Sequence, residues 1–159
     1  MNGTLDPSSG PVPSDMGQLI FERLNGRWRQ SRTIVPGGTY TGEAVFAPIT
    51  PTSLRYTEEG MLVLDGGVPV ISRRSYIYQI ETGRIRVMFD EDPPRLFHDL
   101  DFHSSEGCSK IVSEEAVHIC GSDTYRSTYE IISDKEFIIR HRVFGARKNY
   151  VMTTIYTAI

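Results

Sequence analysis

The chain has 159 residues, and its formal net charge at pH 7 is −3. This length fits a single domain with a sizeable core. The weak negative charge argues against nucleic acid as a partner, because nucleic-acid-binding domains usually carry a clear basic excess. No apolar run approaches the ~20 residues of a membrane-spanning helix. The N-terminus lacks the basic and apolar regions of a signal peptide, so we expect a cytoplasmic protein without a membrane partner.

Residues 1–15 are rich in proline, glycine and serine and contain almost nothing to bury. This composition predicts a disordered tail before a folded domain at 16–159. The Ser-Asp pair at 14–15 supplies a candidate N-cap, and the segment QLIFERLNG that follows has apolar residues at helical spacing. The Asn-Gly pair at 25–26 is a typical helix end. The pattern therefore predicts one short N-terminal helix.

From residue 27 onward, apolar and polar residues alternate, which is typical of strands with one buried face. Glycine, proline and aspartate residues that favour turns separate these runs. The predicted strands are 27–35, 40–47, 53–58, 61–65, 70–80, 84–90, 96–103, 110–119, 123–132, 136–144 and 149–157.

These strands recur about every ten residues and are joined by short links, as in an antiparallel meander. An open sheet of this many strands would leave long exposed edges, and closure into a barrel removes them. We therefore predict an all-β fold, a closed antiparallel up-and-down β-barrel of about ten strands with a short N-terminal helix. A sandwich of two sheets is the alternative.

The two cysteines, Cys108 and Cys120, stand close enough in the sequence to bridge a hairpin. Because nothing else indicates secretion, we expect two free thiols in a reducing compartment. No CxxC, HxxxH or HxH spacing occurs, and the GxGxxG, P-loop and GxSxG motifs are absent. We therefore expect neither a metal nor a cofactor, although histidines and a carboxylate from different strands can still form a non-haem metal site.

Several predicted strands combine tyrosine rings and hydroxyl groups on one face. Arg74, Tyr76 and Tyr78 share a face of one strand, and Tyr125 and Tyr129 share a face of another. A dry barrel core would favour valine, isoleucine and leucine there, whereas small-molecule sites combine aromatic surface with a few polar groups. We therefore predict a ligand-binding lumen, and outward-facing tyrosines with hydrated hydroxyl groups are the alternative. The predicted ligand-binding residues are Tyr56, Arg74, Tyr76, Tyr78, His98, His118, Tyr125, Tyr129, Lys148 and Tyr150.

Two histidines are candidates for acid–base chemistry. His98 lies on an otherwise apolar stripe, where a structural histidine bonded to the backbone is the alternative, and His118 stands near Cys120 and Asp123. A partly buried imidazole titrates near neutrality, which suits a general base. A tyrosine hydroxyl can donate to a developing oxyanion. The candidate catalytic residues are His118, His98, Tyr76 and Tyr125.

Seven blocks of the sequence carry a family pattern: LNGRW at 24–28, GEAVF at 42–46, LRYTEEGMLVL at 54–64, RRSYIY at 73–78, FHDLDF at 97–102, HICGSDTYRSTYEI at 118–131 and VFGARKNYVMTTIY at 143–156. Through its Gly-Arg-Trp at 26–28, which opens the first strand after a short helix, the chain resembles calycin-type barrels such as lipocalins and fatty-acid-binding proteins. More specifically, it resembles an uncharacterised lipocalin-like, single-domain family found in bacteria and lower eukaryotes. The resemblance covers about residues 19–157 and implies a barrel fold, but a fold does not settle a function.

The leading functional hypothesis is a small-molecule binding protein that holds a hydrophobic or aromatic ligand, with an anionic group paired to Arg74. The second is a cofactor-free enzyme, an isomerase, cyclase or dehydratase, that uses histidine and tyrosine in the same pocket. The third is a protein-interaction module that uses the barrel exterior, which a large exposed apolar patch would indicate. The sequence leaves the oligomeric state open.

Overall fold

The computed structural model describes residues 13–105, 107 and 110–159. It confirms the predicted all-β class with one N-terminal helix, α1 (Pro13–Leu24), which begins within the stretch predicted as a tail. Within the described residues, no helix has the length and apolar character needed to cross a membrane. The strands are β1 (Gly26–Val35), β2 (Gly38–Thr50), β3 (Ser53–Leu64), β4 (Val70–Glu81), β5 (Arg84–Phe89), β6 (Leu96–Leu100), β7 (Phe102–Ser104), β8 (Ile111–Ser113), β9 (Ala116–Cys120), β10 (Asp123–Ser133), β11 (Glu136–Phe144) and β12 (Asn149–Ala158).

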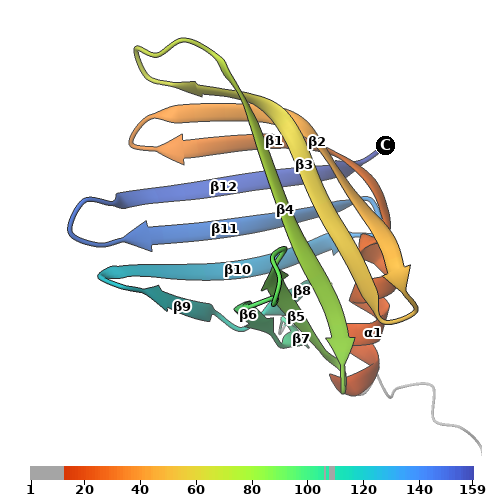
Figure 1. Cartoon of the computed structure of the whole chain (residues 1–159). Coiled ribbons are helices and arrows are strands. Elements are labelled where there is room, and N and C mark those ends of the chain that lie inside the picture. Colours follow the sequence, from red (N-terminus) through yellow and green to blue (C-terminus); the bar gives the residue numbers. More distant parts are fainter. Residues whose placement is uncertain (1–12, 106, 108–109) are drawn as a thin grey trace, which may run out of the picture.

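The strands form one antiparallel sheet in the order β6-β5-β4-β3-β2-β1-β12-β11-β10-β8-β7, and β9 also pairs with β10. The first and last strands of the chain, β1 and β12, lie side by side, so the sheet curls into a nearly closed barrel (Figure 1). This topology confirms the predicted up-and-down barrel and excludes the two-sheet sandwich. Strands β6 and β7, at the two ends of the order, follow each other in the chain.

The barrel closes at Asp101, between these two strands. Leu100 of β6 pairs with Ile85 of β5, whereas Phe102 of β7 pairs with Ser113 of β8. The chain therefore passes directly from one end of the sheet to the other. Toward the opposite end of the barrel, β6 lies beside β9, and no backbone ladder joins them in the described part of the chain. We call this gap between β6 and β9 the seam.

Two predicted strands, 96–103 and 110–119, are each divided in the structure. The first divides because β6 pairs with β5 while β7 pairs with β8. The second divides because β8 pairs near the end of β10, whereas β9 pairs with its beginning. Glu114 lies between β8 and β9, and its backbone amide donates to the carbonyl oxygen of Asp101 at 2.8 Å. The first break is thus set by a change of partner strand and the second by a change of position along the same partner, β10, and local alternation reports neither.

The prediction of separate strands at 53–58 and 61–65 is wrong, because β3 runs unbroken through Gly60. Gly60 pairs directly with Gly42 of β2. A Cβ atom on Gly60 would lie 2.2 Å from a backbone carbonyl oxygen of β2 and 2.7 Å from Cζ of Tyr40. Gly60 is therefore needed for the close approach of backbone and ring rather than for a turn.

Helix α1 covers one end of the barrel (Figure 1). Its Ile20 and Leu24 side chains are buried, and the Leu24 carbonyl accepts a 2.8 Å hydrogen bond from the indole of Trp28. Gly17 packs against the carbonyl group of Gly83 in the β4–β5 turn, so closely that a Cβ would lie 1.9 Å from its oxygen. The opposite end is left open, with the β1–β2, β3–β4, β9–β10 and β11–β12 turns around it (Figure 1).

Candidate functional site

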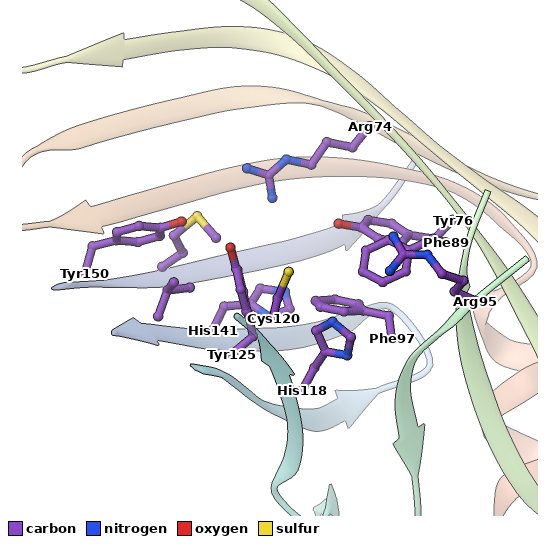
Figure 2. A pocket seen from close by; sticks show the side chains of 12 residues that line it. Arg74, Tyr76, Phe89, Arg95, Phe97, His118, Cys120, Tyr125, His141 and Tyr150 are labelled. Atoms are coloured by element: carbon purple, nitrogen blue, oxygen red, sulfur yellow. The ribbon is translucent and has the colours of Figure 1, made fainter. Parts of the chain in front are cut away.

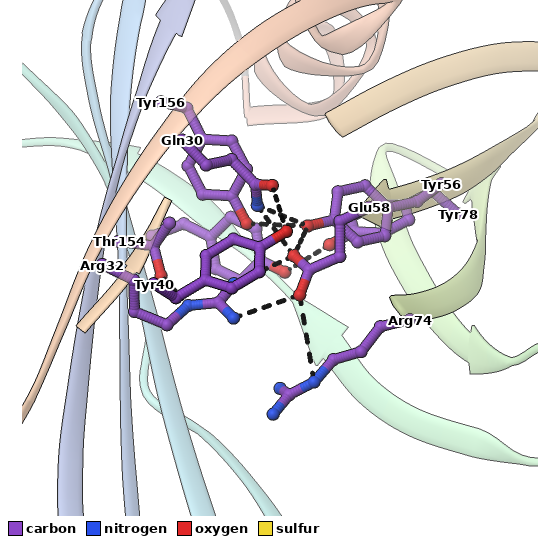
Figure 3. A network of polar contacts seen from close by, with 10 residues as sticks. Gln30, Arg32, Tyr40, Tyr56, Glu58, Arg74, Tyr78, Thr154 and Tyr156 are labelled. Atoms are coloured by element: carbon purple, nitrogen blue, oxygen red, sulfur yellow. Dashed lines mark hydrogen bonds and ion pairs between the residues drawn. The ribbon is translucent and has the colours of Figure 1, made fainter. Parts of the chain in front are cut away.

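The lumen of the barrel contains a buried carboxylate, Glu58 of β3, whose side chain is 2% exposed. The Arg32 guanidinium donates to its two oxygens at 3.1 and 2.9 Å, and Gln30 Nε2 donates at 2.7 Å. The Tyr56 hydroxyl donates to it as well. Arg74 Nε lies 3.9 Å from the same carboxylate (Figure 3). Two arginines therefore share one carboxylate inside the barrel.

Burial opposes charge on Glu58 and Arg32, but their mutual hydrogen bonds outweigh it. Burial acts to raise the pKa of Glu58, yet hydrogen bonds from Arg32, Tyr56 and Gln30 hold that pKa below its ordinary value. Burial likewise acts to lower the pKa of Arg32, and the bonds to Glu58 raise it above its ordinary value. Both groups are charged at neutral pH, so the Arg32–Glu58 pair is neutral as a unit.

Tyrosine hydroxyl groups continue this network. The hydroxyl oxygens of Tyr56 and Tyr156 are 3.0 Å apart, and those of Tyr78 and Tyr129 are 2.6 Å apart. Burial raises the pKa of all four groups, that of Tyr156 to about 12. A cavity of about 20 Å³ remains beside them, which is the size needed for one water molecule. This part of the lumen is therefore filled by side chains.

A larger cavity of about 340 Å³, which we call the mouth pocket, lies at the open end of the barrel. Side chains from β4 to β6 form one wall, and side chains from β9 to β12 form the other (Figure 2). The residues that line the mouth pocket are Arg74, Tyr76, Phe89, Arg95, Phe97, His118, Cys120, Tyr125, His141, Val143, Tyr150 and Met152.

Phe97 is the centre of the aromatic surface in the mouth pocket. Its ring stacks on Tyr76, with centroids 5.5 Å apart and an interplanar angle of 12°. Phe89 lies 4.9 Å from it on the same side of the seam. His118 approaches it edge-on across the seam, with ring centroids 5.3 Å apart. Flat aromatic surfaces of this kind favour a planar, largely apolar ligand.

The charges on the two arginines of the mouth pocket are balanced differently. Arg95 donates to Glu91 at 2.5 Å, so it has its own carboxylate. Arg74, whose side chain is 40% exposed, has only Glu58 within ion-pair distance among the described residues, and Arg32 already neutralises Glu58. The mouth pocket therefore contains one positive charge without a carboxylate of its own.

Three histidines lie in or beside the mouth pocket, and all three favour the neutral form. Burial lowers the pKa of His98 to about 4, although a 3.4 Å contact with the Tyr125 carbonyl acts to raise it. Burial and the neighbouring His98 lower the pKa of His141 to about 3. Burial and Arg95 lower the pKa of His118. A neutral imidazole offers one hydrogen-bond donor and one acceptor.

The histidines differ in how they are held. His141 lies with its Nδ1 atom 2.5 Å from the hydroxyl of Ser127, and this bond orients its ring in the pocket wall. His98 is 2% exposed, and its Nδ1 atom has no hydrogen-bond partner among the described residues. An orphaned buried nitrogen strongly disfavours a proton on it, in line with the lowered pKa. Of the three, His118 and His141 line the pocket.

At the rim of the pocket, Lys148 Nζ donates to the Tyr125 hydroxyl at 2.9 Å and lies 3.2 Å from the carboxylate of Asp123. These two contacts raise the pKa of Lys148 above its ordinary value. The Lys148 charge is thus matched by Asp123. Because the Tyr125 oxygen accepts a bond from Lys148, its own proton is left to donate to another group.

Comparisons with known proteins agree with this architecture. Residues 24–158 match a family of unknown function, DUF6314. The chain belongs to this family. A comparison with curated proteins finds no match.

Several solved structures, including the two below, are similar in fold to this DUF6314 protein. The S-type phycobiliprotein lyase CPES from Guillardia theta superposes with a TM-score of 0.65 at 9% identity, over 94% of this chain and 98% of that chain. EF1p2_mFAP2b, in a structure bound to DFHBI, superposes with a TM-score of 0.51 at 14% identity, over 93% of this chain and 100% of that chain. At these identities the likeness shows the fold alone.

The site residues predicted from the sequence of this DUF6314 protein fall into separate places. Five of them line the mouth pocket together: Arg74, Tyr76, His118, Tyr125 and Tyr150. Three are tyrosines of the buried network: Tyr56, Tyr78 and Tyr129. His98 is buried behind the pocket wall, and its backbone contact matches the structural alternative. Lys148 meets the pocket at its rim through Tyr125.

Sequence reasoning did not place several lining residues in the site. His141 carried a readable signal, because Phe137, Ile139 and His141 alternate on one face of β11 and the first two are buried. The sequence around Phe97 gave no such signal. Phe97 neighbours the buried His98, so alternation would place the Phe97 side chain outside the barrel. The register between β5 and β6 shifts at this point, which lets both side chains turn inward. The other unpredicted lining residues are Phe89, Arg95, Cys120, Val143 and Met152.

Within residues 13–105, 107 and 110–159, no group of three or more His, Cys, Asp or Glu side chains is placed to hold a metal ion. Cys120 is a free, exposed thiol at the pocket, and Cys108 lies outside the described residues. The chemistry available in the mouth pocket is therefore that of aromatic rings, two guanidinium groups, neutral imidazoles, hydroxyl groups and one thiol.

Proposed function

We propose that the protein binds a small aromatic anion in the mouth pocket. The observation that carries this proposal is the unbalanced positive charge of Arg74. Its side chain faces the pocket, and its nearest carboxylate, Glu58, is already paired with Arg32. A guanidinium recognises a carboxylate or sulfonate group through charge-assisted hydrogen bonds. An anionic ligand would complete the charge balance of this cluster.

The aromatic part of the ligand follows from the walls. Tyr76, Phe89 and Phe97 offer ring surface, and the neutral His118 and the Tyr125 hydroxyl offer hydrogen bonds at its edge. A barrel of this fold is able to hold a small molecule, as in the structure of EF1p2_mFAP2b bound to DFHBI. We also propose that the protein acts in the cytoplasm as a lipocalin-like binding protein, and that neither nucleic acid nor a membrane is its partner.

A calorimetric comparison of 2-naphthoate with its neutral isostere 2-naphthamide tests the proposal. In the wild-type protein we expect the carboxylate to bind about 10- to 100-fold more tightly, which is the usual worth of a hydrogen bond to a charged group. Arg74→Met should remove this preference and leave the amide affinity unchanged. Arg73→Met is the matched control, because Arg73 neighbours Arg74 on β4, is 67% exposed and pairs with Glu59 outside the pocket. Equal affinities of both probes for the wild-type protein would refute the role of Arg74.

Cofactor-free isomerisation is a second candidate function, favoured by the contact between Lys148 and Tyr125. In a keto–enol exchange, His118 would accept the proton from the carbon next to a carbonyl group, and Tyr125 would donate its hydroxyl proton to the carbonyl oxygen. Lys148, 2.9 Å from the Tyr125 oxygen, would stabilise the resulting tyrosinate. Reversal of both transfers returns the ketone, so no cofactor is consumed.

Phenylpyruvate, an aromatic anion with exchangeable protons, is a suitable probe for this second function. If the pocket is catalytic, the protein should accelerate exchange of these protons in D₂O, followed by NMR. Tyr125→Phe should then slow exchange by about 10²- to 10⁴-fold, the usual contribution of a positioned acid or base. Tyr156→Phe serves as the control, because Tyr156 is a buried tyrosine that does not line the mouth pocket. Exchange at the buffer rate in the presence of wild-type protein would leave binding as the function.

The interaction-module hypothesis depends on a different part of the molecule. Several large apolar side chains are exposed on the β3–β4 hairpin, at the open end of the barrel: Leu64, Val68, Val70 and Ile71. A docked partner would use such a surface. We place this function after the other two, because the hairpin has no feature that selects one kind of partner.

A further inference from the structure

A second cavity of about 440 Å³ adjoins the mouth pocket and has no part in the proposal above. It lies on the β1–β4 side of the open end, with the β11–β12 turn at its rim; we call it the aliphatic compartment. Three residues line both cavities: Arg74, Tyr150 and Met152. The two cavities are therefore neighbours in one lumen, and Arg74 stands at their boundary.

The walls of the two cavities differ in chemistry. The mouth pocket is built from aromatic rings and imidazoles around Phe97. The aliphatic compartment has Ile34, Leu62 and Leu64 in its wall, and its other lining residues are mostly polar, among them Arg32, Tyr40, Arg147 and Lys148. Straight or branched hydrocarbon packs against such a wall without the stacking that a ring needs.

We infer that the physiological ligand occupies both cavities at once, as an amphipathic acid whose anionic group lies between an aromatic arm and an aliphatic arm. This inference rests on the proposed function, since it uses the same contact between the anion and Arg74. The position of Arg74 at the boundary determines the order of the parts. The ring lies in the mouth pocket, the acid group lies against Arg74, and the alkyl chain extends toward Leu62.

A series of 2-(2-naphthyl)alkanoates, from the acetate through the butanoate and hexanoate to the octanoate, tests the inference by calorimetry. Each added methylene that becomes buried should tighten binding to the wild-type protein by up to about fourfold, the worth of one buried CH₂ group. Leu62→Glu should abolish this gain by placing a charge in the aliphatic compartment. Leu62→Trp should abolish it by filling the space. Naphthylacetate, which has no alkyl arm, should bind Leu62→Trp as it binds the wild type, whereas the new carboxylate of Leu62→Glu shares a cavity with Arg74 and should weaken its binding.

Met61→Glu is the matched control, because Met61 precedes Leu62 on β3, lines neither cavity and is 41% exposed. It should keep the full dependence on chain length. Binding of naphthylacetate with no gain along the series would overturn the two-arm ligand and leave the proposed aromatic-anion site standing. A gain that persists in both Leu62 variants would also overturn the inference, because the chain would then lie elsewhere. No binding of naphthylacetate at all would overturn the proposed function and this inference together.

Discussion

Glu58→Gln is expected to lower the free energy of unfolding by about 3–5 kcal/mol, because it leaves the Arg32 guanidinium charged and unpaired inside the barrel. Glutamine keeps the volume of the side chain, so the loss comes from the charge and its hydrogen bonds rather than from a cavity. Arg32 donates two hydrogen bonds to Glu58, and its own side chain is 6% exposed. Urea unfolding followed by circular dichroism measures the change.

Glu59→Gln is the control for this experiment. Glu59 is the next residue on β3, it also pairs with an arginine, and its side chain is 60% exposed. Exposed ion pairs are worth at most about 1 kcal/mol, so a small effect is expected. Equal losses in the two variants would contradict the buried-pair interpretation.

The same carboxylate should make stability depend on pH in the acid range. The pKa of Glu58 is lowered in the folded state. The ionised carboxylate therefore contributes fully to stability above about pH 4.3, the pKa of a glutamate in an unfolded chain. That contribution is lost as the pH falls through the lower folded-state value. Urea midpoints measured from pH 6 down to pH 3 should therefore decline more steeply for the wild type than for Glu58→Gln. Parallel profiles would show that Glu58 is not the titrating group.

Phe137→Ala is expected to lower the free energy of unfolding by about 3–5 kcal/mol, because it leaves a cavity in the aromatic core. Phe137 is 2% exposed, stacks on Tyr156 with ring centroids 4.2 Å apart, and meets the edge of Trp28 at 4.7 Å. Trp28 is the single tryptophan of the chain, so its fluorescence reports both the unfolding transition and any repacking of this site.

Phe144→Ala, at the other end of β11, is the control. Phe144 is partly exposed and its ring contacts are with the guanidinium groups of Arg126 and Arg142, at 5.8 and 5.7 Å. Cation–π contacts at exposed sites are worth about 0.5–1 kcal/mol. The Phe137 variant should therefore unfold at a clearly lower urea concentration. Similar midpoints would mean that the core tolerates the loss by collapsing around it.

The strand pattern could be predicted because alternation is a local property. Most turns lie where glycine, proline or aspartate interrupts it, and each strand buries one face. The turn predicted at Gly60 is wrong, because glycine occurs both in turns and at close contacts between strands. Only the position of Tyr40 on the neighbouring strand decides between the two. The pairing of β6 and β7 with different strands, and of β8 and β9 with different parts of β10, was likewise a long-range property.

The candidate site could be predicted in part for the same reason. The tyrosines and Arg74 of β4 alternate visibly, and so were assigned to one face. The sequence analysis did not predict a buried charge on β1. Arg29 on one face of this strand is exposed, whereas Arg32 on the other face is buried. Both faces of that strand carry arginine, so residue type alone does not show which arginine lies inside. The partner that stabilises Arg32 inside, Glu58, comes from a different strand.

The seam gives the open end of this barrel a freedom that a fully laddered barrel lacks. In a closed barrel, strand number and shear fix the diameter, and widening it would break backbone hydrogen bonds all along one strand pair. In the described part of this chain, β6 and β9 meet through side chains such as Phe97 and His118, while Asp101 joins the two sides covalently at the far end. Separation of β6 from β9 at the mouth would therefore break no backbone ladder in the described part of the chain. That separation would cost the ring contacts across the seam and the 3.4 Å contact between His98 and the Tyr125 carbonyl, with the strand ladders of the sheet left intact.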